Sequence, residues 1–135
     1  MLISHVDFQV ADFEAAACFY DTVLATLGAS RMVDMSPHAV SWGKQGGGPE
    51  FWVSAQKDGD GFRQSHIAFD APSKEAVDAF CEAAVALGAE VLHSPREWPE
   101  YLDSHLVGYY AAFVRDPDGN NVEAAYAQFA SPEGH

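Results

Sequence analysis

The sequence predicts an α+β fold built from two copies of one βαβββ module. Residues 5–30 and residues 66–90 follow the same plan. Each stretch begins with a histidine in a short strand pattern, continues through an alanine-rich helix pattern and closes on Leu-Gly-Ala. The opening histidine and the closing glycine lie 23 residues apart in the first copy and 22 residues apart in the second. Such self-similarity indicates a repeated structural unit.

The two modules divide the chain into nearly equal parts. The first occupies about residues 1–57 and the second about residues 62–128. A chain of 135 residues is long enough for one packed core, so we expect one domain over residues 1–135.

The first strand and helix follow from the hydrophobic pattern. Residues 6–10 alternate apolar and polar side chains, as a half-buried strand does. Asp12 is a suitable N-cap, and Gly28 suits the left-handed residue that ends a helix. Between these two residues the apolar side chains recur at helical spacing, at Ala16, Tyr20, Val23, Leu24 and Leu27.

The second copy repeats this pattern from His66. Pro72-Ser73 begins its helix and Gly88 ends it. The side chains expected on its buried face are Val77, Phe80, Ala84 and Leu87.

Three strand-like segments follow each helix. Residues 116–120, Asp-Pro-Asp-Gly-Asn, are a strong turn signal between the last two strands of the second module. Residues 95–108 are rich in Pro, Trp, Glu and His, and we expect a loop there. One helix for four strands leaves one face of each sheet uncovered. The expected strands are roughly 30–35, 38–43, 50–56, 89–94, 109–115 and 121–127.

The composition excludes several classes of protein and partner. With 7 Lys+Arg and 20 Asp+Glu the formal net charge is −13, so nucleic acid and anionic membranes are not expected as partners. The expected partner is a small-molecule substrate. No apolar run approaches the about 20 residues of a membrane span. Two cysteines are too few for a disulfide scaffold, and the first residues lack the features of a secretion signal. A reduced, cytoplasmic protein is therefore expected.

Four side chains are expected on the uncovered sheet faces. If the apolar residues of the first strand face the helix, His5 faces the other way. The same alternation places Glu50, His66 and Glu123 on uncovered faces, and a pseudo-twofold axis between the modules would let the four converge. Two imidazoles and two carboxylates suit a divalent ion such as Ni, Zn, Co, Mn or Fe(II). Alternatively, they are ordinary polar residues of half-solvated strands.

Three segments carry a resemblance to a known family. They are residues 3–6 (Ile-Ser-His-Val), residues 65–69 (Ser-His-Ile-Ala-Phe) and residues 116–123 (Asp-Pro-Asp-Gly-Asn-Asn-Val-Glu). Over about residues 2–127 the chain resembles the vicinal oxygen chelate superfamily, which includes glyoxalase I, extradiol dioxygenases, fosfomycin-resistance enzymes and bleomycin-resistance proteins. The resemblance implies two βαβββ modules forming an incomplete barrel around a divalent metal. It also implies that the metal ligands include His5, His66 and Glu123.

Glu50 distinguishes between branches of this superfamily. Glyoxalase I enzymes have a fourth, carboxylate ligand at the position that Glu50 occupies, whereas the dioxygenase and fosfomycin branches generally have three protein ligands. The resemblance therefore implies a metal-dependent lyase or isomerase of glyoxalase I type, acting on a small carbonyl or thiol-adduct substrate by metal-stabilised enolate chemistry. Glu123 would be the catalytic base, with Glu50 as its partner.

Two other functions are compatible with the same residues. One is a non-catalytic protein that sequesters an aromatic ligand, as bleomycin-resistance proteins do, and the other is a ring-cleaving dioxygenase. Because members of the superfamily commonly dimerise, and some build sites from two chains, a homodimer is also expected.

Aromatic side chains are expected to line the substrate site. Trp52 shares a strand face with Glu50, and Trp42, Trp98 and Tyr109 are further candidates. His105, beside the expected loop, is a candidate substrate contact. The alternatives are packing in the core or at a dimer interface for Trp42 and Tyr109, and a solvated loop position for His105.

Overall fold

The computed structural model describes residues 3–56 and 65–130 and contains the two predicted βαβββ modules. The first comprises β1 (Val6–Val10), α1 (Phe13–Ala25), β2 (Ala29–Met35), β3 (Ala39–Lys44) and β4 (Phe51–Ala55). The second comprises β5 (His66–Asp70), α2 (Lys74–Ala86), β6 (Val91–Glu97), a short 3-10 helix (Pro99–Tyr101), β7 (Leu106–Arg115) and β8 (Asn121–Phe129).

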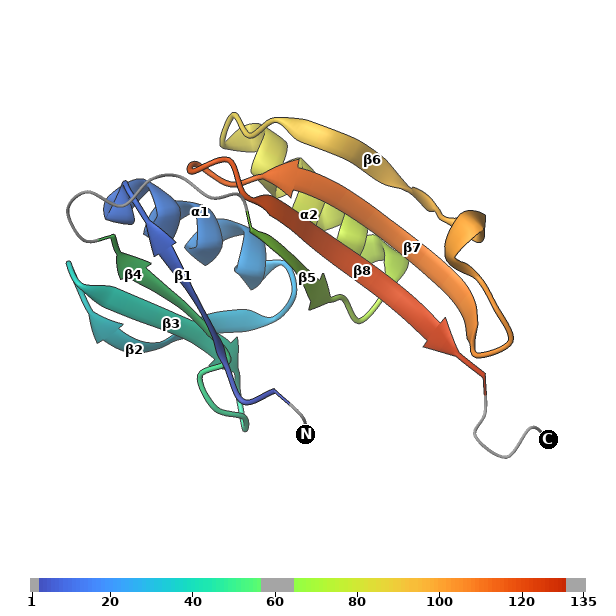
Figure 1. The fold of residues 1–135 in the computed structure, drawn as a ribbon, viewed down its shortest axis with the longest axis horizontal. Helices are drawn as coiled ribbons and strands as arrows, with labels where there is room; N and C mark the ends of the chain where they lie inside the picture. The colour runs from blue at the N-terminus through green and yellow to red at the C-terminus, as the bar shows by residue number, and fades with distance from the viewer. Residues whose placement is uncertain (1–2, 57–64, 131–135) are drawn as a thin grey trace.

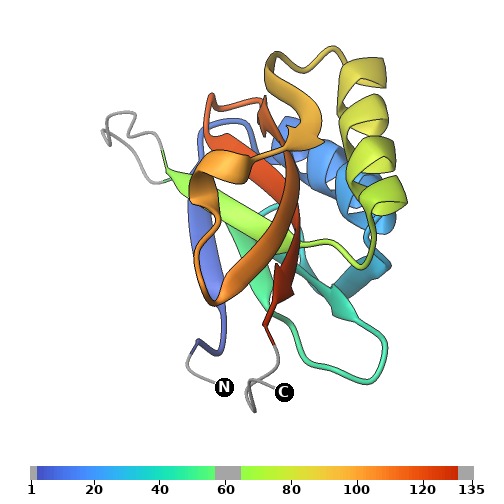
Figure 2. The same cartoon turned by 90° about the vertical axis from the view of Figure 1, so that its right-hand side faces the viewer.

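Each module forms its own four-stranded sheet. The strand orders are β1-β4-β3-β2 and β5-β8-β7-β6, so the first and last strands of each module are neighbours. These neighbours pair in parallel, and the other pairs are antiparallel. Figure 1 shows the two open sheets side by side, and Figure 2 shows that α1 and α2 lie together on one side of them. Within the described residues, neither α1 nor α2 covers the opposite face of either sheet, as the sequence predicts.

Both helices begin and end as their sequences indicate. The side chain of Asp12 accepts a hydrogen bond from the backbone N–H of Ala15, and that of Ser73 accepts one from Ala76. Gly28 and Gly88 follow the helices at φ of 87° and 85°, the left-handed region that glycine tolerates. The predicted capping residues are confirmed.

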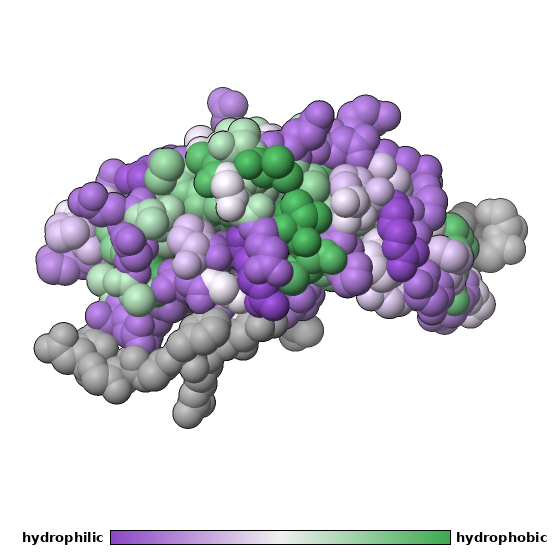
Figure 3. All heavy atoms as spheres, turned by 90° about the horizontal axis from the view of Figure 1, so that it is seen from above, coloured by the Kyte–Doolittle hydropathy of each residue, from purple (hydrophilic) through white to green (hydrophobic). Residues whose placement is uncertain are grey.

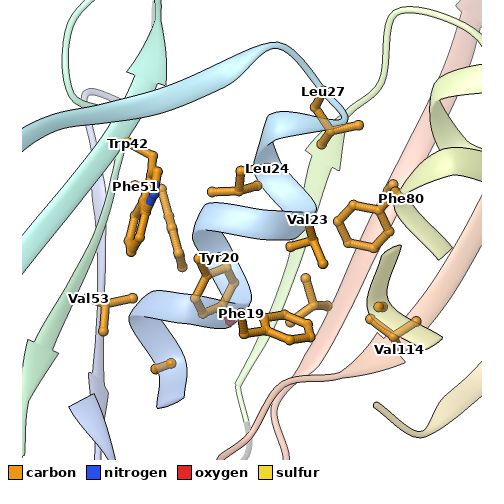
Figure 4. Packing of buried hydrophobic residues seen from close by; sticks show 14 of the residues in the cluster. Phe19, Tyr20, Val23, Leu24, Leu27, Trp42, Phe51, Val53, Phe80 and Val114 are labelled. Atoms are coloured by element: carbon orange, nitrogen blue, oxygen red, sulfur yellow. The ribbon is translucent and has the colours of Figure 1, made fainter. Parts of the chain in front are cut away.

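Helix α1 is the centre of the core. All five of its predicted apolar positions are buried. Figure 4 shows Tyr20 turned toward Trp42 and Phe51 of the first sheet, while Val23 lies toward Phe80 of α2. The helix therefore packs on its own sheet and on the second module.

Two local expectations were wrong. Leu87 is 43% exposed at the C-cap of α2, which ends at Ala86. The loop expected over residues 95–108 is shorter, since β6 continues to Glu97 and β7 begins at Leu106. Pro95 is tolerated in β6 because this is an edge strand, and its pairing with β7 shifts register between His93 and Arg96.

The surface agrees with the acidic composition. Seen from above, hydrophilic side chains dominate both ends of the molecule, and hydrophobic ones gather near its middle (Figure 3). In residues 3–56 and 65–130, every helix falls short of the length and apolarity that a membrane-spanning segment requires.

Candidate functional site

His66 and Glu123 meet on the uncovered face of the second sheet. They lie on the neighbouring parallel strands β5 and β8, where His66 is opposite Asn121 and Ala68 is opposite Glu123. The Nε2 atom of His66 is 3.1 Å from Oε1 of Glu123. The side chain of Glu123 is 4% exposed and that of His66 is 48% exposed. A buried carboxylate thus meets an imidazole that solvent reaches, and we call these two residues the His66–Glu123 pair.

Both ring nitrogens of His66 face hydrogen-bond acceptors. Nδ1 lies 3.1 Å from the carbonyl oxygen of Asn121. When the neutral ring carries its hydrogen on Nδ1, it donates to this carbonyl oxygen and Nε2 presents a lone pair. This lone pair faces a carboxylate oxygen, which is also an acceptor when Glu123 is ionised. Two acceptors at this separation need a proton or a cation between them.

The donor set therefore fits a divalent metal ion. Histidine ligands usually donate their second ring N–H to a carbonyl or carboxylate, and Nδ1 of His66 is placed to do so to Asn121. Imidazole nitrogen and carboxylate oxygen are both common ligands of zinc and similar ions.

Tyr109 holds the other oxygen of Glu123. Its hydroxyl group donates a hydrogen bond to Oε2 from β7, the strand next to β8. Burial, together with this hydrogen bond, raises the pKa of Tyr109 above its usual value, so the hydroxyl remains a donor at neutral pH. One oxygen of Glu123 is thus bound to Tyr109, and the other faces His66.

An aromatic wall lies beside the pair on the same sheet face. We use this name for Trp98, Tyr101, Tyr109 and Phe113. Phe113 stacks against His66 with ring centroids 6.0 Å apart, and Trp98 stacks against Tyr101 at 5.3 Å. Trp98 and Phe113 belong to a buried cluster that is separate from the main core. Of the expected substrate contacts, Trp98 and Tyr109 therefore lie next to the His66–Glu123 pair.

His5 and Glu50 lie together in the first module. The N–H of Val6 donates to the carbonyl oxygen of Glu50 at 2.9 Å. His5 and Glu50 therefore lie immediately before β1 and β4, two strands that pair in parallel. Both side chains are exposed, and Glu50 lines a cavity of about 250 Å³ at the junction of the modules. Trp52 is half-buried on β4, directly opposite Asp7 of β1.

A single chain does not gather all four expected ligands. Within the described ranges, no group of three or more His, Cys, Asp or Glu side chains is placed to hold a metal ion. Figure 1 shows β1 and β5 in separate sheets, running in opposite directions. The convergence of His5, Glu50, His66 and Glu123 stays a prediction.

Two expected substrate contacts lie away from this pair. Trp42 is 1% exposed in the main core, where its Nε1 donates to Asp21 at 2.9 Å. Val40 and Trp42 share the helix side of β3, so Trp42 is not on the uncovered face. His105 precedes β7 at the end of the sheet where Leu106 pairs with Phe129, far along the strand from Glu123.

Sequence reasoning missed the contact of Tyr109 with Glu123, although a signal for it exists. The turn at residues 116–120 sets the hairpin register, in which Phe113 pairs with Glu123. Because alternate strand residues share a face, Tyr109, four positions before Phe113, lies on the same face as Glu123. Counting outward from the turn would have found it.

Comparisons with known proteins agree with this architecture. A family model described as a glyoxalase-like domain matches residues 5–125. The uncharacterized protein YqjT of Bacillus subtilis is 30% identical over 133 residues, which cover 88% of this chain and 94% of that protein.

Solved structures show the same fold. A glyoxalase/bleomycin resistance protein from Albidiferax ferrireducens is 29% identical with a TM-score of 0.77, over 93% of this chain and 99% of that one. A lactoylglutathione lyase from Agrobacterium tumefaciens is 24% identical with a TM-score of 0.65, over 92% of each chain. At that identity the likeness concerns the fold alone.

Proposed function

The chain belongs to the glyoxalase-like domain family of the vicinal oxygen chelate superfamily, and on that basis we propose that it is a metal-dependent lyase or isomerase of glyoxalase I type. Its substrate is a small carbonyl compound or thiol adduct. The observation that supports this proposal best is the His66–Glu123 pair, in which Nε2 of the imidazole and a carboxylate oxygen face each other at 3.1 Å.

The proposed metal ligands are His66 and Glu123 of one chain with His5 and Glu50 of a second copy. A bound Ni, Zn, Co, Mn or Fe(II) ion would stabilise the negative charge that develops on a substrate oxygen. A partner is proposed because no group of three or more ligand-type side chains within the described residues of one chain is placed to hold a metal ion. A twofold symmetric homodimer would form two equivalent sites, since each chain gives one pair to each site.

Glu123 is the proposed catalytic base, which takes a proton from the carbon next to the substrate carbonyl. Its carboxylate is held at Oε2 by Tyr109, so Oε1 is the oxygen presented to the site. Glu50 of the partner subunit is the second carboxylate of the proposed site. His66 is oriented by Asn121 and remains in place throughout the reaction.

The aromatic wall is the proposed substrate surface in the second module. Trp98 and Tyr109 stand beside the His66–Glu123 pair, and the buried Trp98 excludes water from that side. Trp52 lies on the uncovered face of the first sheet, which would close over the partner's second sheet in the dimer.

The reducing compartment expected from the composition is compatible with the cysteines. Cys18 and Cys81 are both free thiols. We therefore propose a cytoplasmic location.

Metal content tests the proposal. Protein purified without chelator is expected to hold about one divalent ion per chain by elemental analysis, because a twofold dimer has two sites. His66→Ala should lose this ion, and His38→Ala, a change in the exposed turn between β2 and β3, should keep it. The loaded enzyme is then screened against hemithioacetals. Absence of both metal and turnover would refute the proposal.

A second function is favoured by the aromatic wall. Its stacked rings also suit a planar ligand, so the chain could sequester an aromatic molecule without catalysis. Stoichiometric binding of an aromatic cation to metal-free protein, with no turnover in the loaded form, would establish this alternative.

A further inference from the structure

We propose that Asn120 and Asp116 are positioning residues for the His66–Glu123 pair, and that Tyr20 links them to helix α1. This inference rests on the proposed function for its catalytic meaning. The hydrogen bonds that support it exist independently of that function. It assigns a task to the Asp-Pro-Asp-Gly-Asn segment, which carries the family resemblance and includes none of the expected ligands.

Asp116 is the centre of this network. Its carboxylate is 4% exposed and accepts four hydrogen bonds. The backbone N–H groups of Asp118 and Asn120 donate to Oδ1 at 2.9 and 2.8 Å. The Tyr20 hydroxyl donates to Oδ2 at 2.7 Å, and the side-chain amide of Asn120 donates to the same atom at 3.0 Å. One buried carboxylate therefore fixes the turn before β8 and fastens it to helix α1.

Asn120 carries the connection to the site. This residue is 3% exposed, and while its Nδ2 donates to Asp116, its Oδ1 accepts the backbone N–H of Ser65 at 2.8 Å. The carbonyl oxygen of Ser65 in turn accepts from the N–H of Asn121 at 2.9 Å. Ser65 immediately precedes His66, so both polar groups of its backbone are held against the start of β8.

The register fixed at Ser65 determines where His66 lies. With β5 held there, Nδ1 of His66 meets the carbonyl oxygen of Asn121 at 3.1 Å, and Nε2 meets Glu123 at 3.1 Å. A slip of β5 by one residue would turn His66 to the helix side of the sheet. A continuous hydrogen-bonded chain thus runs from Tyr20 on α1, through the turn, to the His66–Glu123 pair.

An ordinary turn offers a competing explanation. In that case residues 116–120 would stabilise the β7–β8 hairpin and have no influence on the imidazole of His66. The two explanations differ in what they predict for the tautomer of the His66 ring. Positioning predicts that loss of Asn120 frees the start of β5 and lets the ring change tautomer, whereas a structural turn predicts lower stability with an unchanged ring.

The test is nitrogen NMR of the histidine rings in full-length, metal-free protein at alkaline pH. Wild-type His66 is expected to show one predominant tautomer, because both of its ring nitrogens have fixed partners, and Asn120→Ala is expected to show a mixture. Ser73→Ala, which removes the N-cap of α2 and destabilises the fold elsewhere, is the matched control and should keep the wild-type ring signals. Should Asn120→Ala fail to fold, Asn120→Ser, whose shorter side chain cannot make both side-chain hydrogen bonds of Asn120, decides in the same way.

A cobalt titration separates this inference from the proposed function. If the wild type binds Co²⁺, Asn120→Ala should bind it about 10–100-fold more weakly, the usual effect of losing a residue that orients a ligand. If the wild type binds no Co²⁺ but the tautomer still changes in Asn120→Ala, the positioning role stands and the metal site is refuted. Wild-type ring signals in a folded Asn120→Ala would overturn the inference.

Discussion

Replacing Tyr109 by Phe removes one hydroxyl and keeps the ring that packs in the aromatic wall. The hydroxyl donates to Oε2 of Glu123, whose side chain is almost fully buried. Without it, this oxygen loses its donor and has little water to replace it. A hydrogen bond to a charged group contributes about 1.5–3 kcal/mol, so Tyr109→Phe should lower the free energy of unfolding of the metal-free protein by that amount.

Urea denaturation at pH 7 measures this loss. For a chain of this length it corresponds to a fall in Tm of about 5–10 °C. The control is Tyr101→Phe, which deletes the same atom from an exposed ring of the same wall. Its effect should stay within about 0.5 kcal/mol of zero, as exposed substitutions usually do. Equal stabilities of the two variants would show that Tyr109 does not support the buried carboxylate.

Three further predictions concern the pH dependence of stability and the packing of the first sheet. Burial raises the pKa of Asp118, so the folded state binds this proton more tightly than the unfolded state and loses stability as pH rises through that pKa. Asp118→Asn keeps an oxygen for the N–H of Ala11, so it should raise the urea midpoint at pH 7 and leave it unchanged at pH 3. A lower midpoint at pH 7 would contradict the destabilising role of the Asp118 charge. Burial and Asp116 also raise the pKa of Tyr20, so the free energy of unfolding should hold below about pH 10 and fall above it. Tyr20→Phe should be less stable at pH 7, yet its free energy of unfolding should decline less steeply between pH 10 and 11. The same decline with pH in both proteins would refute the assignment. A Cβ on Gly43 would lie 2.2 Å from the carbonyl oxygen of Gly48, so Gly43→Ala should lower the free energy of unfolding by about 1–3 kcal/mol. Gly47→Ala, in the neighbouring turn, should be tolerated. Similar urea midpoints for the two variants would contradict this account.

The fold was predictable because it is encoded locally and twice. The helix of residues 13–25 has an N-cap, an apolar stripe and a terminal glycine, all of which are in the sequence, and the second copy repeats them. The incorrect predictions concern residues whose secondary structure or burial depends on contacts with other elements of the fold. Arg96 and Glu97 are in a strand because β7 pairs with them, and Leu87 at the C-cap of α2 is exposed, whereas its counterpart Leu27 is buried.

The site was predictable only in part, for a related physical reason. Strand alternation placed His66 and Glu123 on the uncovered face, and their contact follows from the parallel register of β5 and β8. Trp42 shows the opposite case, because its large ring suits a ligand pocket and a core equally well, and packing against Tyr20 puts it in the core. The proposed meeting of the two His–Glu pairs involves a second chain, which no pattern within one sequence supplies.

Mixing two inactive variants tests the shared metal site most directly. His5→Ala and His66→Ala are unfolded together in equal amounts and refolded, so that half of the dimers contain one chain of each kind. In such a dimer one site lacks both histidines and the other is complete, so the mixture should recover about a quarter of the wild-type metal content and turnover. Neither variant alone should recover either. If the mixture stays as inactive and metal-free as its components, the His5 and His66 ligands do not meet across two chains, and the account is contradicted.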